Sequence, residues 1–260
     1  MPKSLPIICV AENGVDAASL SETHKAWARS NGFAGQSGRL LALPDTEGKI
    51  ETYLFGLGPK SNRSALVLGL AASALPSGTY RLEGDYGDPT LAALGFRLGA
   101  YGFDRYTKAK DRPVLELPEG ADAAEIENLV TSAFIARDLV NIPANDLGPD
   151  AFEAWITDFA GTHNVPIKVV RGDDLLAHNF PMIHAVGRAS GQAPRLVDFC
   201  WGDAAHPKLT LVGKGVTFDT GGLNIKPSSS MALMKKDMGG AANVLGLANA
   251  IMASRYACVF

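Results

Sequence analysis

The first hundred residues alternate short apolar runs with turn-forming residues. Residues 5–10 form an apolar run typical of a buried strand, and residues 50–58 alternate in polarity and then reach glycines, as in a strand that ends in a turn. Residues 65–70 fit either a strand or a buried helix, and residues 91–103 are typical of a helix that glycines interrupt. Strands mixed with helices predict an α/β domain.

A charged stretch that ends in proline follows at residues 107–113 and has the composition of a linker. Asp122 then precedes Glu125 by three positions, the spacing of a capping box, and apolar residues recur behind it at helical spacing. Pro143 cannot continue this helix. The pattern predicts three parts: an N-terminal α/β domain at 1–112, a linker and connecting helix at 113–140, and a second domain at 141–260.

The second domain also mixes helical and strand patterns. We expect a helix at 151–161, strands at 167–170, 195–201 and 209–213, and a last helix from about Asp237 with one apolar face. A strand followed by a glycine-rich loop and a helix is the usual layout of an active site in a parallel sheet.

Composition and charge exclude several classes of function. The chain has 260 residues, with 24 basic and 27 acidic side chains, so its net charge of −3 gives no support for nucleic-acid binding. No apolar run approaches the roughly 20 residues of a membrane helix, and prolines interrupt the N-terminus, so we expect a cytoplasmic protein without a membrane partner. Cys9, Cys200 and Cys258 lack the paired spacing of disulfides or zinc sites.

The candidate chemistry lies near the end of the chain, where Asp219 and Asp237 are the only acids after residue 207, amid six basic residues. In one interpretation, loop N–H groups and Lys214 hold a phosphate, although the spacing of the known phosphate-binding loops is missing. In a second, the two aspartates are ligands of a metal ion. A structural interpretation, with Asp237 as a helix cap and Asp219 as a turn residue, also stays open.

Two longer segments favour the metal interpretation. Residues 213–222 with Lys226 and Pro227, and residues 234–242, resemble the metal-binding core of the leucyl aminopeptidases, peptidase family M17, in residue types and spacing. Residues 137–145 resemble the entry into that family's catalytic domain. The resemblance covers roughly residues 120–260.

The resemblance implies a role for each of five side chains. Lys214, Asp219 and Asp237 match metal ligands, with Asp219 bridging two divalent ions, Zn²⁺ or Mn²⁺. Lys226 matches a catalytic lysine that stabilises the tetrahedral intermediate, and Met234 matches a residue of the pocket for the N-terminal side chain. Spacing alone is typical of an anion-binding cation at Lys214, so its role as a ligand rests on the resemblance.

The resemblance also implies a fold and an activity. The fold is a small N-terminal α/β domain before an incomplete α/β/α catalytic domain with a mixed, largely parallel sheet. The activity is the release of N-terminal, leucine-like amino acids from peptides by a homohexamer. The family pattern continues with an Asn-Thr-Asp-Ala-Glu-Gly-Arg segment that carries two further ligands and an arginine, and this sequence has no such segment.

We therefore expect the 260-residue chain to be a truncated and inactive part of a longer metallo-aminopeptidase. The alternatives are a nucleotide- or phosphate-binding module without hydrolysis, and a structural remnant that keeps only the oligomer interface.

Overall fold

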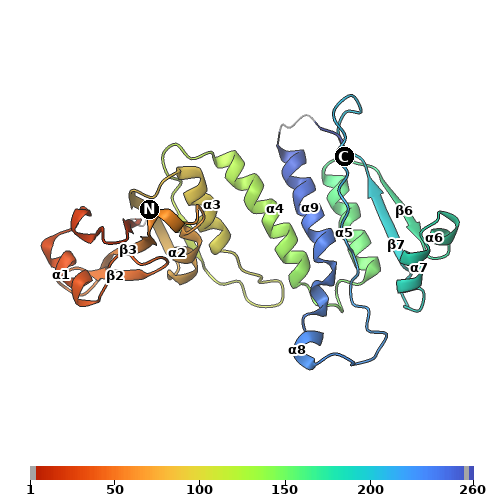
Figure 1. Ribbon diagram of the computed structural model, residues 1–260, viewed down its shortest axis with the longest axis horizontal. Coiled ribbons are helices and arrows are strands. Elements are labelled where there is room, and N and C mark those ends of the chain that lie inside the picture. Colours follow the sequence, from red (N-terminus) through yellow and green to blue (C-terminus); the bar gives the residue numbers. More distant parts are fainter. Residues whose placement is uncertain (1–3, 255–257) are drawn as a thin grey trace. The chain divides into compact units, whose positions relative to one another are not determined.

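The computed structural model describes residues 4–254 and 258–260 (Figure 1). By its internal contacts the chain divides into two compact units, Met1–Val130 and Thr131–Phe260. The division falls within α4 (Ala123–Asn141), the helix that the sequence predicts between the two domains. The boundary at residue 112 stays a prediction. None of the helices formed by the described residues is long and apolar enough to cross a membrane.

The first unit is built on a five-stranded sheet in the order β2-β3-β1-β4-β5. β1 pairs in parallel with β3 and β4, and β4 pairs in parallel with β5, whereas β2 is antiparallel to β3. The α/β organisation predicted for this part of the chain and the strands predicted at 5–10 and 50–58 are thus confirmed. The strands are β1 (Leu5–Ala11), β2 (Leu40–Pro44), β3 (Ile50–Gly58), β4 (Gly78–Gly84) and β5 (Pro113–Leu115).

Alternate strand positions send side chains into two separate cores. Phe55 packs in one core with Phe96 of α3, whereas Leu54 packs in the other with Ala28 of α1. Because successive residues of a strand point to opposite faces, the two cores lie on opposite sides of the sheet. The helices of this unit are η1 (Val15–Ala17), α1 (Glu22–Ser30), η2 (Lys60–Asn62), α2 (Leu68–Ala74) and α3 (Pro89–Gly99).

The glycines expected to interrupt a helix instead allow close packing of α2 against α3. A Cβ atom on Gly99 would overlap the backbone of Gly69, so only glycine fits at this approach of the two helices. The segment at 65–70, which fits either a strand or a buried helix by its sequence, leads into a helix, because α2 begins at Leu68.

The predicted start of α4 is confirmed by its cap. One carboxylate oxygen of Asp122 accepts hydrogen bonds from the backbone N–H groups of Ala124 and Glu125, each at 3.0 Å. The helix ends at Asn141, shortly before Pro143.

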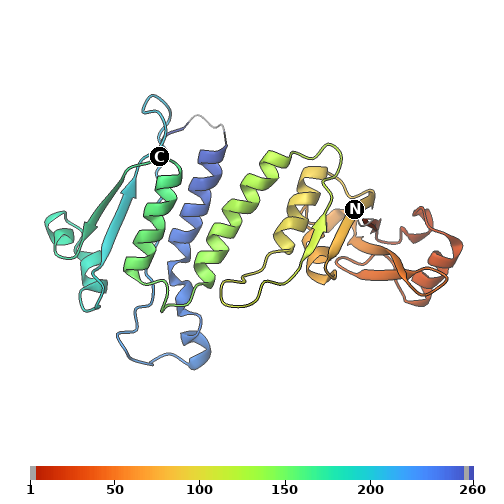
Figure 2. The same ribbon diagram turned by 180° about the vertical axis from the view of Figure 1, so that it is seen from behind.

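The second unit contains the end of α4, further helices and a two-stranded sheet in which β6 and β7 are antiparallel (Figure 2). Within this unit α9 lies against α4, because Asn249 donates a hydrogen bond of 2.9 Å to Ser132 and both side chains are buried. The elements are α5 (Pro149–Thr162), β6 (Ile167–Arg171), α6 (Asp174–Ala177), α7 (Pro181–Gly187), β7 (Arg195–Phe199), α8 (Ser228–Met231), η3 (Met234–Met238) and α9 (Gly239–Ala253).

The strand predicted at 209–213 is wrong, since these residues have no regular secondary structure. Lys208 forms an isolated parallel bridge with Val259, and the N–H of Leu209 donates to the Val259 carbonyl at 2.7 Å. A strand exists only where a neighbour supplies backbone partners. Among the described residues, that pairing stops at Leu209. An apolar run shows that a segment suits a sheet but not that a partner is present.

This difference changes the setting of the candidate site. Lys214 and Asp219 lie in an irregular segment rather than behind the end of a regular strand, and Asp237 lies in η3, directly before α9.

Candidate metal centre

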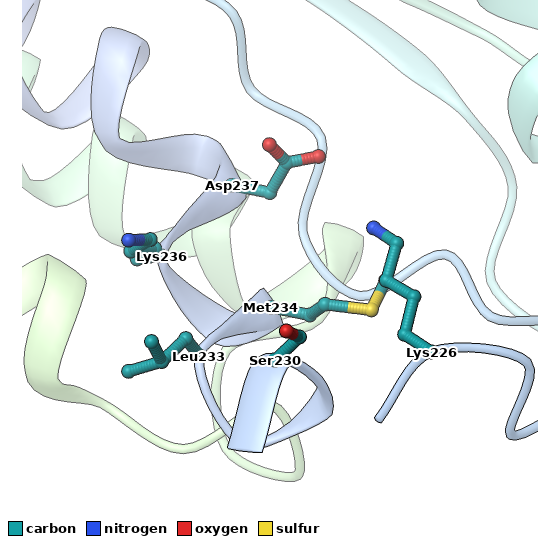
Figure 3. A pocket seen from close by; sticks show the side chains of 6 residues that line it. All are labelled: Lys226, Ser230, Leu233, Met234, Lys236 and Asp237. Carbon is teal, nitrogen blue, oxygen red and sulfur yellow. The ribbon is translucent and has the colours of Figure 1, made fainter. Parts of the chain in front are cut away.

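Three of the five candidate site residues, Lys226, Met234 and Asp237, line a pocket of about 250 Å³ in the second unit (Figure 3). Lys226 comes from the irregular segment, and α8 begins after Pro227, whose fixed backbone suits the start of a helix. Met234 and Asp237 come from η3, and in Figure 3 the Met234 side chain extends toward the side of the pocket that holds Lys226. The pocket is lined by Lys226, Ser230, Leu233, Met234, Lys236 and Asp237.

The structure brings together Lys214 and Asp237. The Lys214 ammonium forms an ion pair with the Asp237 carboxylate and also donates to the Asp237 backbone carbonyl at 3.2 Å. The side chains are 54% and 45% exposed, so this ion pair contributes at most about 1 kcal/mol to stability. The ion pair matters for the site because it brings the amine nitrogen of Lys214 next to a carboxylate oxygen of Asp237.

Backbone contacts fix this pairing. The N–H of Ala241, in the first turn of α9, donates to the Lys214 carbonyl at 2.9 Å. A Cβ atom on Gly213 would lie 2.5 Å from the Cα of Ala241, and one on Gly240 would lie 3.0 Å from the backbone nitrogen of Lys214. The glycines in this motif therefore let the Lys214 segment approach the start of α9.

The chemistry of these two groups fits a divalent metal ion. A carboxylate oxygen is a common ligand of Zn²⁺ and Mn²⁺, and an amine nitrogen can bind a metal when it has lost its proton. Asp219 is exposed and does not line the pocket. Across the described part of the chain, no group of three or more His, Cys, Asp and Glu side chains could hold an ion. The role of Asp219 as a bridging ligand thus stays a prediction.

Two features of the same geometry disfavour the phosphate interpretation. The Lys214 ammonium is already paired with the Asp237 carboxylate. The backbone carbonyl of Lys214 already accepts a hydrogen bond from the N–H of Ala241, at the start of α9. An anion site at this helix would need both groups free.

The sequence did not predict three of the residues that line the pocket, which are Ser230, Leu233 and Lys236. A signal for two of them was present in the spacing. Positions 230, 233, 234 and 237 follow the pattern of one helical face, which would have grouped Ser230 and Leu233 with Met234 and Asp237.

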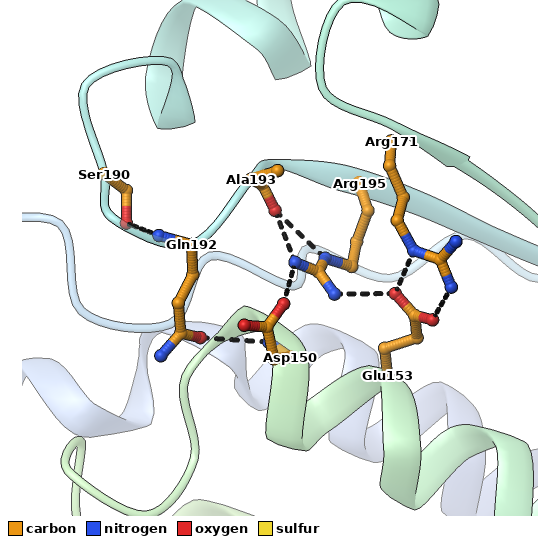
Figure 4. A network of polar contacts seen from close by, with 7 residues as sticks. All are labelled: Asp150, Glu153, Arg171, Ser190, Gln192, Ala193 and Arg195. Atoms are coloured by element: carbon orange, nitrogen blue, oxygen red, sulfur yellow. Dashed lines mark hydrogen bonds and ion pairs between the residues drawn. The ribbon is translucent and has the colours of Figure 1, made fainter.

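A network of charged side chains joins α5 to both strands of the second unit (Figure 4). Arg195 of β7 forms ion pairs with Asp150 and, at 2.6 Å, with Glu153, and Arg171 of β6 also pairs with Glu153. The side chains of Arg195 and Glu153 are only 9% and 11% exposed. The hydrogen bonds from Arg171 and then Arg195 hold the pKa of Glu153 below its usual value of 4.5.

Two family models match the chain. The model described as "Cytosol aminopeptidase family, catalytic domain" matches residues 134–259, and "M17 aminopeptidase, N-terminal domain" matches residues 6–118. Fold and motif thus define an M17-type α/β protein with a candidate metal centre in its second unit. The chain belongs to the M17 cytosol aminopeptidase family, which confirms the family that the sequence indicated.

Curated relatives and solved structures agree with this assignment. A probable cytosol aminopeptidase of Methylobacterium radiotolerans is 35% identical, over 89% of this chain and 51% of the relative. The crystal structure of cytosol aminopeptidase from Coxiella burnetii matches with a TM-score of 0.84 and 33% identity, over 100% of this chain and 58% of that one. The bottromycin maturation enzyme BotP in complex with Mn matches at 0.80 and 32%, over 99% and 58%. The chain spans about half the length of the curated relatives it matches.

Proposed function

We propose that this chain carries part of a metal-dependent aminopeptidase that releases N-terminal amino acids, preferentially leucine-like ones, from peptides. The observation that carries the proposal is the pairing of the Lys214 amine with the Asp237 carboxylate, beside a pocket lined by Lys226 and Met234, in a chain of the M17 family.

We infer that Lys214, Asp219 and Asp237 would hold two divalent ions, Zn²⁺ or Mn²⁺, with Asp219 as the ligand that both ions would share. The Mn complex of BotP, 32% identical to this chain, supports Mn²⁺. When bound, the ions would supply Lewis-acid chemistry for the activation of a water molecule and the polarisation of the scissile carbonyl. Lys214 would hold an ion through the nitrogen of its amine.

The remaining residues act on the substrate. The Lys226 ammonium stabilises the negative charge that develops on the carbonyl oxygen during attack. Met234 contacts the side chain of the N-terminal residue, and its flexible, apolar thioether suits a leucine-like group. Both residues line the same pocket as Asp237, which is the arrangement that this division of roles requires.

We further infer that the 260 residues alone bind metal weakly and do not hydrolyse peptides. Metal affinity follows the number and charge of the ligands, and only two candidate ligands converge here. The family resemblance supports a homohexamer for the intact enzyme, and the names of the cytosol aminopeptidase relatives support a cytoplasmic location.

Calorimetric titration of the 260-residue chain with Mn²⁺ and Zn²⁺ tests the metal assignment. We expect measurable binding that Asp237→Asn weakens at least tenfold, while the control Asp158→Asn, an exposed aspartate on α5, leaves it unchanged. Thermal stabilisation by ATP or ADP-ribose without any response to metal would favour the nucleotide-binding alternative instead.

A further inference from the structure

Lys235 lies on η3 between Met234 and Lys236, both of which line the pocket together with Asp237, but Lys235 itself does not line it. Its ammonium donates a hydrogen bond of 2.7 Å to the backbone carbonyl of Asn141, and the contact is partly buried. Asn141 is the last residue of α4, so this hydrogen bond joins two segments that are 94 positions apart.

The end of α4 is a natural partner for an ammonium group. The last carbonyls of an α-helix have no partner within the helix, and this end carries a partial negative charge. A lysine that reaches such a carbonyl satisfies it and gains from the charge.

The geometry of η3 links this contact to the pocket. In a 3₁₀ helix, residues three positions apart lie on the same side. Met234 and Asp237 therefore share one side, and both line the pocket. Lys235 and Met238 share another, where Met238 is completely buried and Lys235 bonds to Asn141.

A helix of five residues does not fix its own rotation, because 3₁₀ hydrogen bonds are weak and no side chain caps its start. Its orientation comes from α9, which follows it directly, and from contacts of its side chains with other segments. Met238 supplies an apolar anchor at its end, and Lys235 supplies a directional one near its start.

We propose that Lys235 is a positioning residue, whose hydrogen bond to the Asn141 carbonyl turns Met234 and Asp237 toward the pocket. The inference rests on the proposed function. Removing the ammonium lets η3 rotate or fray, which displaces the Asp237 carboxylate from Lys214 and the Met234 thioether from the pocket.

The test compares Lys235→Met, Lys235→Arg and the control Lys168→Met, an exposed lysine on β6, in the 260-residue chain. Two measurements are made: Mn²⁺ affinity by calorimetry, and hydrogen exchange of the amides of residues 234–238. We expect Lys235→Met to weaken Mn²⁺ binding about tenfold and to speed exchange in η3, but not in β6 or β7. Lys235→Arg keeps a donor of similar reach and is expected to restore both to within threefold.

Unchanged Mn²⁺ affinity in Lys235→Met, or failure of Lys235→Arg to restore it, would overturn the proposal. Faster exchange throughout the unit would also overturn it, because that result marks a purely structural lysine. If the unsubstituted chain binds no Mn²⁺, the proposed function fails instead. The exchange of residues 234–238 then still decides whether Lys235 holds η3 in place.

Discussion

Lys214 and Asp237 lie 23 positions apart and form an ion pair at the start of α9. Both belong to segments whose backbones are held together by the Ala241–Lys214 hydrogen bond, so the pairing does not depend on the side chains alone. A lysine and an aspartate that share one point in space can hold a cation between them once the lysine is neutral.

The first prediction concerns the Lys214 side chain. Lys214→Met removes the amine but keeps most of the apolar stem, so we expect Mn²⁺ affinity to fall at least tenfold. The free energy of unfolding is expected to change by less than about 1 kcal/mol, because the ion pair is exposed. Calorimetric titration and denaturant unfolding measure the two effects. A variant that binds Mn²⁺ like the unsubstituted chain would remove Lys214 from the site.

The second prediction uses two glycines with opposite surroundings. Gly213→Ala places a Cβ atom 2.5 Å from the Ala241 Cα and should destabilise the second unit by about 1–3 kcal/mol and weaken Mn²⁺ binding. Gly161→Ala, on α5, has nothing within 4 Å of the new atom and should stabilise the helix by about 0.5–1 kcal/mol. Urea unfolding of both variants gives the comparison. Equal effects of the two substitutions would show that the close approach of residue 213 to α9 is absent.

The third prediction concerns the charged network on α5. Glu153→Gln removes the carboxylate shared by Arg171 and the nearly buried Arg195, and at pH 7 we expect a loss of about 2 kcal/mol. Asp158→Asn, on the same helix, serves as the control.

The network also predicts a pH dependence. Because folding lowers the pKa of Glu153, its contribution to stability is complete above the unfolded value of about 4.5 and is lost as the pH falls through the lower folded pKa. The difference between Glu153→Gln and the unsubstituted chain should therefore shrink at acidic pH. A difference that stays constant from pH 7 down to pH 3 would contradict this account.

Local sequence signals predicted elements whose cause is itself local. Asp122 marked the start of α4 because a cap acts within three residues, and the apolar run at 5–10 marked β1 because a strand buried on both faces has few polar positions. The strand at 209–213 failed because strand formation depends on a distant partner, which an apolar pattern does not report. Lys214 and Asp237 were grouped through the family resemblance, since no local rule joins residues separated by an irregular loop.

The position of Lys235 relative to the pocket was not predicted from the sequence. Its separation from Met234 and Asp237 on η3 follows from a three-residue repeat, yet the sequence predicted that an α-helix begins near Asp237. The observed 3₁₀ geometry of residues 234–238 places Lys235 on the same side as Met238, away from Met234 and Asp237.

The fourth prediction concerns the segment at 210–213. In the described part of the chain, the backbone N–H groups of these four positions donate no hydrogen bond. We therefore expect their amides to exchange at least tenfold faster than those of β6. Hydrogen exchange followed by NMR or mass spectrometry resolves the two segments. Protection of residues 210–213 equal to that of β6 would show that the segment is already paired as a strand.

The most direct test of the account is a crystal structure of the chain grown with Mn²⁺, with the ion located by its anomalous scattering. We predict an anomalous peak within bonding distance of the Lys214 amine and the Asp237 carboxylate, with Asp219 drawn in as a further ligand. A peak bound elsewhere, or none beside Lys214 and Asp237 at a saturating Mn²⁺ concentration, would contradict the assignment of this site to a metal ion.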